Sequence, residues 1–332
     1  MSRPRKIAVL GSNSFSGSDF VDLLLESDQY DVLGISRSPE KGPLFLPYLR
    51  HTSPRFQFYR ADLNRDMDQL LERLDRFAPE AIVNFAAQSE VAPSWAHPDQ
   101  WFQTNTVALA KLIDHLKDQR YLQRYVHISS PEVYGTCTGT VTEAAPLNPS
   151  TPYAASKAAA DLLLSTYRKN FSFPLVTVRS TNVYGAHQQL FKIIPRTVIY
   201  LRQGRRIQLH GGGHAVKSYI HIRDISRGEL AIMERGQLGE TYHLSPDQGV
   251  AVRDVVRYLC EAVGRSFTEA TEEVAERLGQ DAAYVIDSIK ARRDLGWSPR
   301  VTLAEGLQGV ISWVERYAAE IEQHPWEYQH QA

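Results

Sequence analysis

The sequence predicts an α/β fold built on a doubly wound parallel sheet, followed by a smaller mixed α/β lobe. Short β-rich runs alternate with amphipathic stretches through the first half of the chain. Each β-rich run is apolar throughout, as expected for strands of a parallel sheet covered by helices on both faces. After Gly185 the alternation fails, and shorter elements with glycine-rich punctuation follow.

The expected elements of the sheet follow one another in regular order. Strands are predicted at residues 6–11, 30–36, 55–63, 81–87, 124–130 and 175–185. Helical spacing predicts helices at residues 19–27, 68–77, 104–116 and 151–170, and Pro79 ends the second of them. Beyond residue 185, a strand is expected at 219–222 and helices around 251–263 and 303–321.

The change of pattern near residue 180 predicts two domains. We expect a sheet domain at residues 1–180, with a returning segment near 215–235, and a second lobe at 181–330. Such a lobe would close over the carboxyl edge of the sheet, where doubly wound folds bind ligands. The last stretch, HPWEYQHQA, is expected to be loosely held.

Composition excludes several classes of function. The chain has 332 residues, is 43% hydrophobic and has a formal net charge of −1, so no charge footprint for nucleic acid or an anionic membrane is present. Two cysteines, Cys137 and Cys260, make no disulfide framework, and neither they nor the histidines have metal-ligand spacing. There is no apolar run of membrane-spanning length and no room for a signal peptide before the first strand, so a soluble cytoplasmic protein is expected.

The turn after the first strand has the glycine pattern of a phosphate-binding loop. It reads GSNSFSG, residues 11–17. Gly11 would allow the tight turn, and Gly17 would let the helix pack closely with its amino terminus aimed at a pyrophosphate. Ser14 stands in place of the middle glycine of a dinucleotide fingerprint, and a strand-to-helix turn also needs glycine for purely structural reasons. The position of the loop at the start of a βαβ run favours a Rossmann dinucleotide site.

The end of the second strand bears on the choice of cofactor. Ser36, Arg37 and Ser38 stand there, and no carboxylate follows until Glu40. An acidic residue would bind the ribose hydroxyls of NAD, whereas Arg37 could pair with a ribose 2′-phosphate. The alternative is that Arg37 is a solvated loop residue. The sequence is compatible with NAD and with NADP as the cofactor, and Arg37 slightly favours NADP.

A tyrosine and a lysine are spaced for proton transfer. Tyr153 and Lys157 lie four residues apart at the start of a predicted helix, so they share one face. A tyrosine with an ordinary pKa of about 10 is a poor base at neutral pH. A neighbouring ammonium group and a positive nicotinamide ring would both favour its phenolate. Such a base could take the proton of a sugar hydroxyl while hydride leaves the same carbon.

Several motifs together resemble those of one enzyme family. They are GSNSFSGS, NFAAQSEV (84–91), HISSPEVYG (127–135), YAASK (153–157), RSTNVYG (179–185), KIIP (192–195), SYIHIRD (218–224) and RLGQDAAYVIDSIKARRDLGW (277–297). Nearly end to end, the chain resembles the extended short-chain dehydrogenases/reductases of the nucleotide-sugar epimerase/dehydratase family. It is most similar to the 4,6-dehydratases that act on dTDP-glucose and GDP-mannose.

The resemblance implies a fold, a cofactor and a dimer. The fold is a Rossmann domain with a small nucleotide-sugar lobe, and two copies pair through helices of the first domain. NAD or NADP is held tightly and regenerated in each turnover. The implied cofactor contacts are Gly11, Ser14, Phe15, Ser16, Gly17, Ser36, Arg37, Asp62, Leu63, Ala86, Ala87, Tyr153 and Lys157.

The resemblance also assigns roles within HISSPEVYG. In the family this motif places a hydroxyl on the sugar's 4-hydroxyl, then an Asp acid and a Glu base near C5 and C6. Ser130 matches the hydroxyl donor and Glu132 the base, whereas Pro131 stands where the acid is expected. Since proline has no proton to give, either Glu132 serves both ends of the elimination or a water or another side chain protonates the leaving hydroxyl.

Substrate contacts follow from the resemblance in the same way. Asn182, Lys192 and Arg277 are placed near the diphosphate, and Lys217 stands where many relatives have arginine. Ser89 and Glu90 belong to the segment that faces the sugar, where Glu90 replaces a common histidine. Nothing in residues 186–210 identifies the nucleotide base.

Three other readings compete with a nucleotide-sugar 4,6-dehydratase. A nucleotide-sugar epimerase would use Tyr153, Lys157 and Ser130 but has no strict need for Glu132. A decarboxylase would need a cationic grip on a substrate carboxylate, and Glu90 argues against one. A non-catalytic dinucleotide-binding regulator predicts loss of the tyrosine, lysine and serine, and all three are present.

Overall fold

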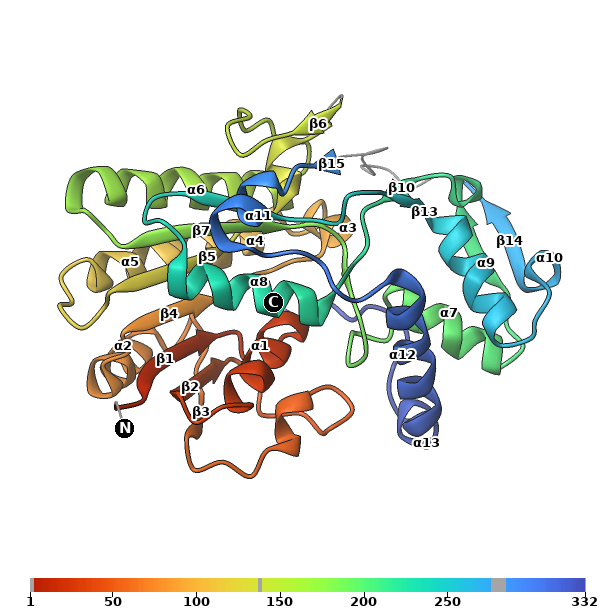
Figure 1. Ribbon diagram of the computed structural model, residues 1–332, viewed down its shortest axis with the longest axis horizontal. Helices are drawn as coiled ribbons and strands as arrows, with labels where there is room; N and C mark the ends of the chain where they lie inside the picture. The colour runs from red at the N-terminus through yellow and green to blue at the C-terminus, as the bar shows by residue number, and fades with distance from the viewer. Residues whose placement is uncertain (1–2, 137–138, 276–284, 332) are drawn as a thin grey trace.

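The computed structural model describes residues 3–136, 139–275 and 285–331 and contains one seven-stranded sheet (Figure 1). The strand order is β12-β7-β5-β4-β1-β2-β3, and all neighbours run parallel. The strands are β1 (Arg5–Leu10), β2 (Tyr30–Ser36), β3 (Phe56–Arg60), β4 (Ala81–Asn84), β5 (Arg124–Ile128), β7 (Leu175–Ser180) and β12 (Thr241–Leu244). The predicted doubly wound α/β fold is confirmed.

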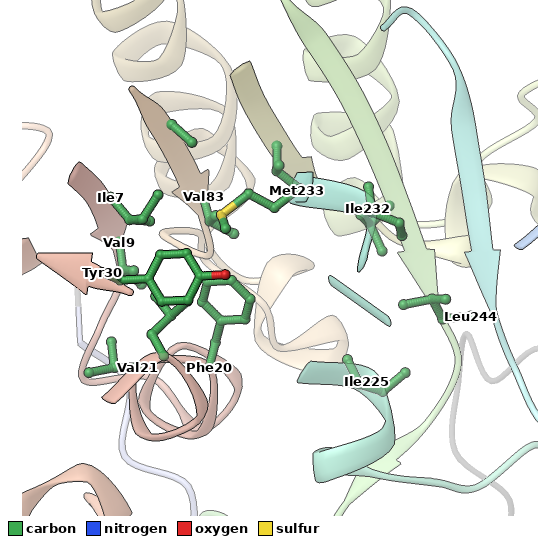
Figure 2. Close-up of a cluster of buried hydrophobic side chains, with 14 of the residues drawn as sticks. Ile7, Val9, Phe20, Val21, Tyr30, Val83, Ile225, Ile232, Met233 and Leu244 are labelled. Carbon is green, nitrogen blue, oxygen red and sulfur yellow. The ribbon is translucent and has the colours of Figure 1, made fainter. Parts of the chain in front are cut away.

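Helices cover both faces of the sheet (Figure 1). One face carries α2 (Met67–Phe77), α4 (Pro98–Phe102), α5 (Leu109–Leu116) and α6 (Pro152–Phe171). The other carries α1 (Phe15–Leu25), α8 (Ile222–Arg235) and α11 (Ile289–Leu295). Alternation along β1 shows why: Ile7 and Val9 join the core under α1 and α8, whereas Ala8 and Leu10 join the core under α2 and α5. Figure 2 shows the first of these cores.

The second lobe has its own hydrophobic core. Its helices are α7 (Ile193–Arg202), α9 (Val252–Ala262), α10 (Phe267–Ala270), α12 (Leu303–Arg316) and α13 (Ala318–Ile321). Its strands pair in twos: β9 (Ile207–His210) with β14 (Thr271–Val274), and β10 (Val216–Lys217) with β13 (Val250–Ala251). Two further strand pairs also lie outside the main sheet: β8 (Val183–Tyr184) with β11 (Ile220–His221), and β6 (Thr140–Val141) with β15 (Val285–Ile286).

Several element boundaries differ from the predicted ones. The run 175–185 is not one strand, because β7 ends at Ser180 and β8 pairs outside the main sheet. The helix predicted at 104–116 starts at Pro98 and passes through a π-helix at Gln103–Ala108. Strand β12, four residues long, was missed because TYHL is too short to show a period. The helix at 303–321 is interrupted at Tyr317.

The chain returns to the first lobe after residue 180. The proposed boundary follows the last residue of β7, and α8 packs against α1 within the expected returning segment. Strand β12 then joins the edge of the main sheet, and α11 packs on α8 and β12. We therefore propose that the first domain comprises residues 1–180 with these returning elements, and that the second takes the rest of 181–330.

No helix among the described residues is long and apolar enough to cross a bilayer.

The segment 326–331 is packed, contrary to the expectation that it is loosely held. The indole of Trp326 donates to the Ile321 carbonyl at 2.9 Å. The ring of His330 stacks on His97 and on Trp101, at centroid distances of 4.7 and 5.4 Å. Aromatic rings supply enough contact area to hold a short segment that has no regular structure.

A buried carboxyl group in α8 leads to a stability prediction. Glu229 is fully buried, and neither of its carboxyl oxygens has a hydrogen-bond partner among the described residues. Burial, and then the charge of Asp19, raises the pKa of Glu229 well above its usual value. We expect Glu229→Met to raise the free energy of unfolding by about 1–3 kcal/mol, because it removes an unpaired buried polar group.

The stability gain of Glu229→Met should grow with pH. Because the pKa of Glu229 is higher in the folded protein than in the unfolded chain, neutral Glu229 does not oppose folding at a pH below the unfolded-state pKa. As the pH rises from the unfolded-state pKa toward the folded-state pKa, the wild-type protein loses stability. The gain should therefore widen by about 1.4 kcal/mol per pH unit in that window. Urea unfolding at about pH 5 and about pH 8 measures it. Glu229→Gln is the control, because it removes the pH dependence but keeps a buried polar group; an equal gain at both pH values would contradict a buried neutral Glu229.

Candidate active site

The candidate site lies at the carboxyl edge of the main sheet. The strand order reverses direction between β1 and β4, which is where doubly wound sheets form a ligand crevice. The loops after these strands, the amino terminus of α1 and the first turn of α6 all face this edge. All site residues that the sequence predicted between positions 11 and 157 lie in these segments or at or just after the ends of the neighbouring strands β2, β3 and β5.

The loop GSNSFSG forms a close cradle between β1 and α1. Gly11 has a φ of +81°, and a Cβ added there would lie 2.8 Å from the backbone nitrogen of Ala86. A Cβ on Gly17 would lie 2.3 Å from the Gly11 carbonyl oxygen. Ser14 caps α1, since its hydroxyl accepts from the Gly17 N–H at 3.0 Å. This explains a serine where the fingerprint has a glycine, and the loop fits a dinucleotide pyrophosphate.

The remaining predicted cofactor contacts surround this cradle. Phe15 and Ser16 are the first residues of α1, Asp62 and Leu63 follow β3, and Ala86 and Ala87 follow β4. The Asp62 carboxylate accepts from the Asn64 N–H at 2.8 Å, which shapes that turn. The structure thus brings the predicted set together along one edge, at the ends of four different strands.

The residues after β2 are occupied by contacts within the chain. The Ser36 hydroxyl is buried and accepts from the Asn13 N–H at 2.9 Å. Arg37 donates to the Gln331 carbonyl at 3.2 Å, and the Gln88 side chain donates to the same oxygen at 2.9 Å. One carbonyl therefore links the loop after β2 to the loop after β4. Nothing in these contacts favours a 2′-phosphate over a ribose hydroxyl.

The tyrosine, lysine and serine of the predicted catalytic set meet at the first turn of α6. Tyr153 and Lys157 are both buried, and the Ser130 hydroxyl lies near enough to the Tyr153 hydroxyl to act on its pKa. The Lys157 ammonium group donates to the Ile128 carbonyl at 2.7 Å. This carbonyl precedes Ser129 and Ser130, so the lysine fixes the end of β5 against α6.

Burial sets the proton affinities of the two groups. It raises the pKa of Tyr153; the negative charge of Glu132 adds to this, and the hydrogen bond from Ser130 opposes it. Burial lowers the pKa of Lys157 to about 8, against the opposing charge of Asp161. In the protein alone, Tyr153 is therefore a protonated phenol, and its ionisation requires added positive charge nearby.

The chain turns sharply between Ser130 and Glu132. Residues Pro131–Tyr134 form a 3-10 helix capped by Ser130, whose hydroxyl accepts from the Glu132 N–H at 3.2 Å. Proline suits the first position of such a helix, because the N–H that it lacks would have no partner there. The turn places Glu132 in the wall of a cavity of about 900 Å³.

Most of the predicted substrate contacts line this cavity. Ser89, Glu90, Lys192 and Lys217 lie in its wall, and Glu90 pairs with Lys192 at 2.7 Å. Asn182 lines an adjoining cavity of about 400 Å³ that also includes Glu90, Lys192 and Lys217. Its side-chain oxygen is buried with no hydrogen-bond partner in the described part of the chain. Arg277 lies outside the described residues.

Sequence reasoning missed the far wall of the cavity. That wall comprises Phe191, Arg196, Tyr200, Arg205, Arg206, Glu327 and Tyr328. Lys192, Arg196 and Tyr200 recur every four residues, so helical spacing along α7 could have identified two of them. Cationic side chains and aromatic rings in one wall suit a phosphorylated ligand that carries a nucleobase.

Comparison with known proteins places this architecture in a family. The family model for GDP-mannose 4,6 dehydratase matches residues 9–310. A dTDP-glucose 4,6-dehydratase of Streptomyces antibioticus is 32% identical, over 92% of this chain and 91% of that protein. The chain belongs to the extended short-chain dehydrogenase/reductase family of NAD-dependent nucleotide-sugar epimerases and dehydratases, as the sequence motifs predicted.

Solved structures agree with this assignment. The dTDP-glucose 4,6-dehydratase of Streptomyces venezuelae, solved with NAD bound, superposes with a TM-score of 0.87 at 31% identity, covering 95% of this chain and 98% of that one. The UDP-glucuronic acid 4-epimerase of Bacillus cereus, solved with UDP-glucuronic acid and NAD, gives 0.84 at 27% identity, covering 94% and 99%. Both relatives hold NAD, so the lean to NADP from Arg37 is not supported.

Proposed function

We propose that this protein is a nucleoside-diphosphate-sugar 4,6-dehydratase. The observation that carries the proposal is Glu132, a carboxylate in the wall of the large cavity, two residues after the Ser130 that acts on the pKa of Tyr153. One turn thus carries both the serine beside Tyr153, the candidate proton acceptor for oxidation at C4, and a candidate base for C5. A 4-epimerase needs only the first of these.

We infer that the cofactor is NAD. The glycine cradle fits a dinucleotide, and relatives of the same fold bind NAD. Gly11, Ser14 and Gly17 would hold the pyrophosphate, and residues after β2, β3 and β4 would hold the two nucleosides. When bound, the nicotinamide supplies a hydride acceptor for C4 and then a hydride donor for C6, and its positive charge favours the phenolate of Tyr153.

The protein's own residues carry the proton steps. Tyr153 takes the proton of the 4-hydroxyl, with Ser130 hydrogen-bonded to it and Lys157 beside it on the same helix face. The resulting C4 ketone acidifies the C5 proton, and Glu132 removes that proton. The C6 hydroxyl then leaves as water and takes the proton from Glu132, because Pro131 has none to give. When C6 receives the hydride back, C5 takes up a proton from solvent, which completes the 4-keto-6-deoxy sugar. Lys192 and Lys217 offset the charge of the diphosphate, and Asn182 donates to it.

We also infer that two copies of the chain associate. Apolar side chains are exposed on the helices that cover one face of the first domain: Phe102, Val107 and Leu162 are 37%, 43% and 61% exposed. They belong to α4, to the π-helix and to α6. A helical face with exposed apolar residues of this kind suits a homodimer interface.

Mass spectrometry tests the proposed reaction. The protein is incubated in deuterated water with a panel of GDP-, UDP-, dTDP- and CDP-sugars. We expect one of them to give a product lighter by one water and carrying solvent deuterium at C5, which also identifies the base. An unchanged composition with altered stereochemistry would instead identify an epimerase, and loss of carbon dioxide a decarboxylase. Tight cofactor binding with no turnover of any sugar would favour a regulator.

A further inference from the structure

The turn that carries Glu132 is held at both ends by buried polar groups. At its amino end, the Ser129 hydroxyl donates to Oδ2 of Asp161 at 2.8 Å. At its carboxyl end, the Tyr134 hydroxyl accepts a hydrogen bond from Nη1 of Arg179. Every residue from 129 to 134 except Glu132 is itself buried.

A single guanidinium group joins the two anchors. Nη2 of Arg179 donates to Oδ2 of Asp161 at 2.7 Å, while Nη1 of the same side chain binds Tyr134. The guanidinium carbon lies 4.7 Å from the centre of the Tyr134 ring. Burial alone would raise the pKa of Asp161, but the His127 ring, whose Nε2 lies 3.3 Å from Oδ1 of Asp161, and the charge of Arg179 lower it to about 2. Arg179 and Asp161 therefore form an ion pair inside the protein.

The network continues into the edge strand of the sheet. The Tyr134 hydroxyl donates to Nε2 of His243 on β12 at 2.7 Å, and Nδ1 of His243 donates to the Asp287 carbonyl at 3.0 Å. Burial lowers the pKa of His243 to about 3, so the ring is neutral and can accept from Tyr134. The Tyr134 hydroxyl is thereby fixed from two directions.

These contacts tie a short turn to the rigid part of the fold. Asp161 lies on α6, one helical turn beyond Lys157, and Arg179 lies on β7, an inner strand of the sheet next to the edge strand β12. Because Glu132 is carried by a 3-10 helix of only four residues, its direction depends on how that helix is held at its two ends. General-base catalysis requires that direction, because the base must reach the proton at hydrogen-bond distance.

We propose that Tyr134, Arg179 and Asp161 are positioning residues that aim Glu132 at the C5 proton of the sugar. The inference rests on the proposed dehydratase function. The three residues need not touch the substrate, and they act by fixing both ends of the turn. Displacement of a reacting group by about 1 Å costs about 100-fold in rate.

Tyr134→Phe tests this role, because it keeps the ring beside the guanidinium and removes only the hydroxyl. We expect the elimination step to slow about 10- to 100-fold. Oxidation at C4 should remain near normal, because Tyr153 and Lys157 lie on α6 and Ser130 lies at the amino end of the turn, which the hydrogen bond from Ser129 to Asp161 still holds in this variant. The oxidised sugar and the reduced nicotinamide should then accumulate, which near-ultraviolet absorbance records, while KM changes little.

Tyr242→Phe is the matched control. Like Tyr134, Tyr242 is buried, but it lies on β12, and its hydroxyl accepts from the Gln237 N–H at 3.0 Å, outside the network. Its loss should leave turnover unchanged. If Tyr134→Phe shows no accumulation and turns over like Tyr242→Phe, the network only stabilises the fold and the inference is overturned. If the wild-type protein dehydrates no sugar in the panel, the proposed function fails with it, and the two failures are told apart by the wild-type result.

Discussion

Replacement of Glu132 by glutamine is expected to stop water loss while leaving oxidation at C4 in place. An amide of the same shape fills the same part of the cavity wall but cannot take the C5 proton. Loss of a positioned general base lowers the rate of its step by about 10²- to 10⁴-fold. In a single-turnover experiment, reduced nicotinamide should form and persist, and no product lighter by one water should appear.

The same substitution should alter the pH dependence of C4 oxidation. The negative charge of Glu132 is one cause of the raised pKa of Tyr153. Its removal lowers that pKa, so a larger fraction of Tyr153 is ionised at any given pH. The rise of the C4 oxidation rate with pH should therefore begin at a lower pH in Glu132→Gln than in the wild type. Stopped-flow absorbance of the reduced nicotinamide over a pH series measures this shift.

A control and a contrary outcome complete this test. Glu261→Gln makes the same chemical change on the exposed surface of α9 and should behave as the wild type. Dehydration by Glu132→Gln at the normal rate would show that another group removes the C5 proton. Glu90 in the wall of the same cavity is another candidate, although its carboxylate is already paired with Lys192 at 2.7 Å.

The pattern of buried strands predicted both the sheet and the group of polar residues at its carboxyl edge. Strands buried on both faces are apolar throughout, so β1, β4 and β5 stand out from the helices between them. Because all strands of the sheet run parallel, the polar residues that follow these strands had to meet at one edge. The loop at Gly11 and the pair of Tyr153 and Lys157 are local patterns, and local patterns survive in a sequence without a structure.

The buried polar network and the wall of the large cavity could not be predicted, because they are formed by residues far apart in the chain. Asp161, Arg179 and His243 come from α6, β7 and β12, and they meet in one network only when the sheet and its covering helix are assembled. The cavity wall likewise joins α7 to Tyr328, which lies against Phe191 at a centroid distance of 5.4 Å. No periodicity in a single segment records such contacts. The cap formed by Ser14 is the opposite case, because it is local: serine is one of the residues favoured at the amino-terminal cap of a helix.

Tyr153→Phe is expected to remove C4 oxidation, and with it every later step. The phenylalanine ring can occupy the same buried position at the first turn of α6, so the fold and cofactor binding should be retained. Without the hydroxyl, the 4-hydroxyl of the sugar loses the group that takes its proton, and kcat should fall by about 10²- to 10⁴-fold. Reduced nicotinamide should not form, in contrast to the accumulation expected for Glu132→Gln.

The contrast between these two variants separates the two halves of the proposed reaction. Tyr167→Phe is the control, because Tyr167 lies on the same helix, and its hydroxyl contacts Asp114 at the far end from the site. If Tyr153→Phe still forms reduced nicotinamide with the sugar, Tyr153 is not the base for the first step. Lys157, whose pKa burial lowers to about 8, would then be the next group to replace, since a neutral amine beside the 4-hydroxyl can also accept its proton.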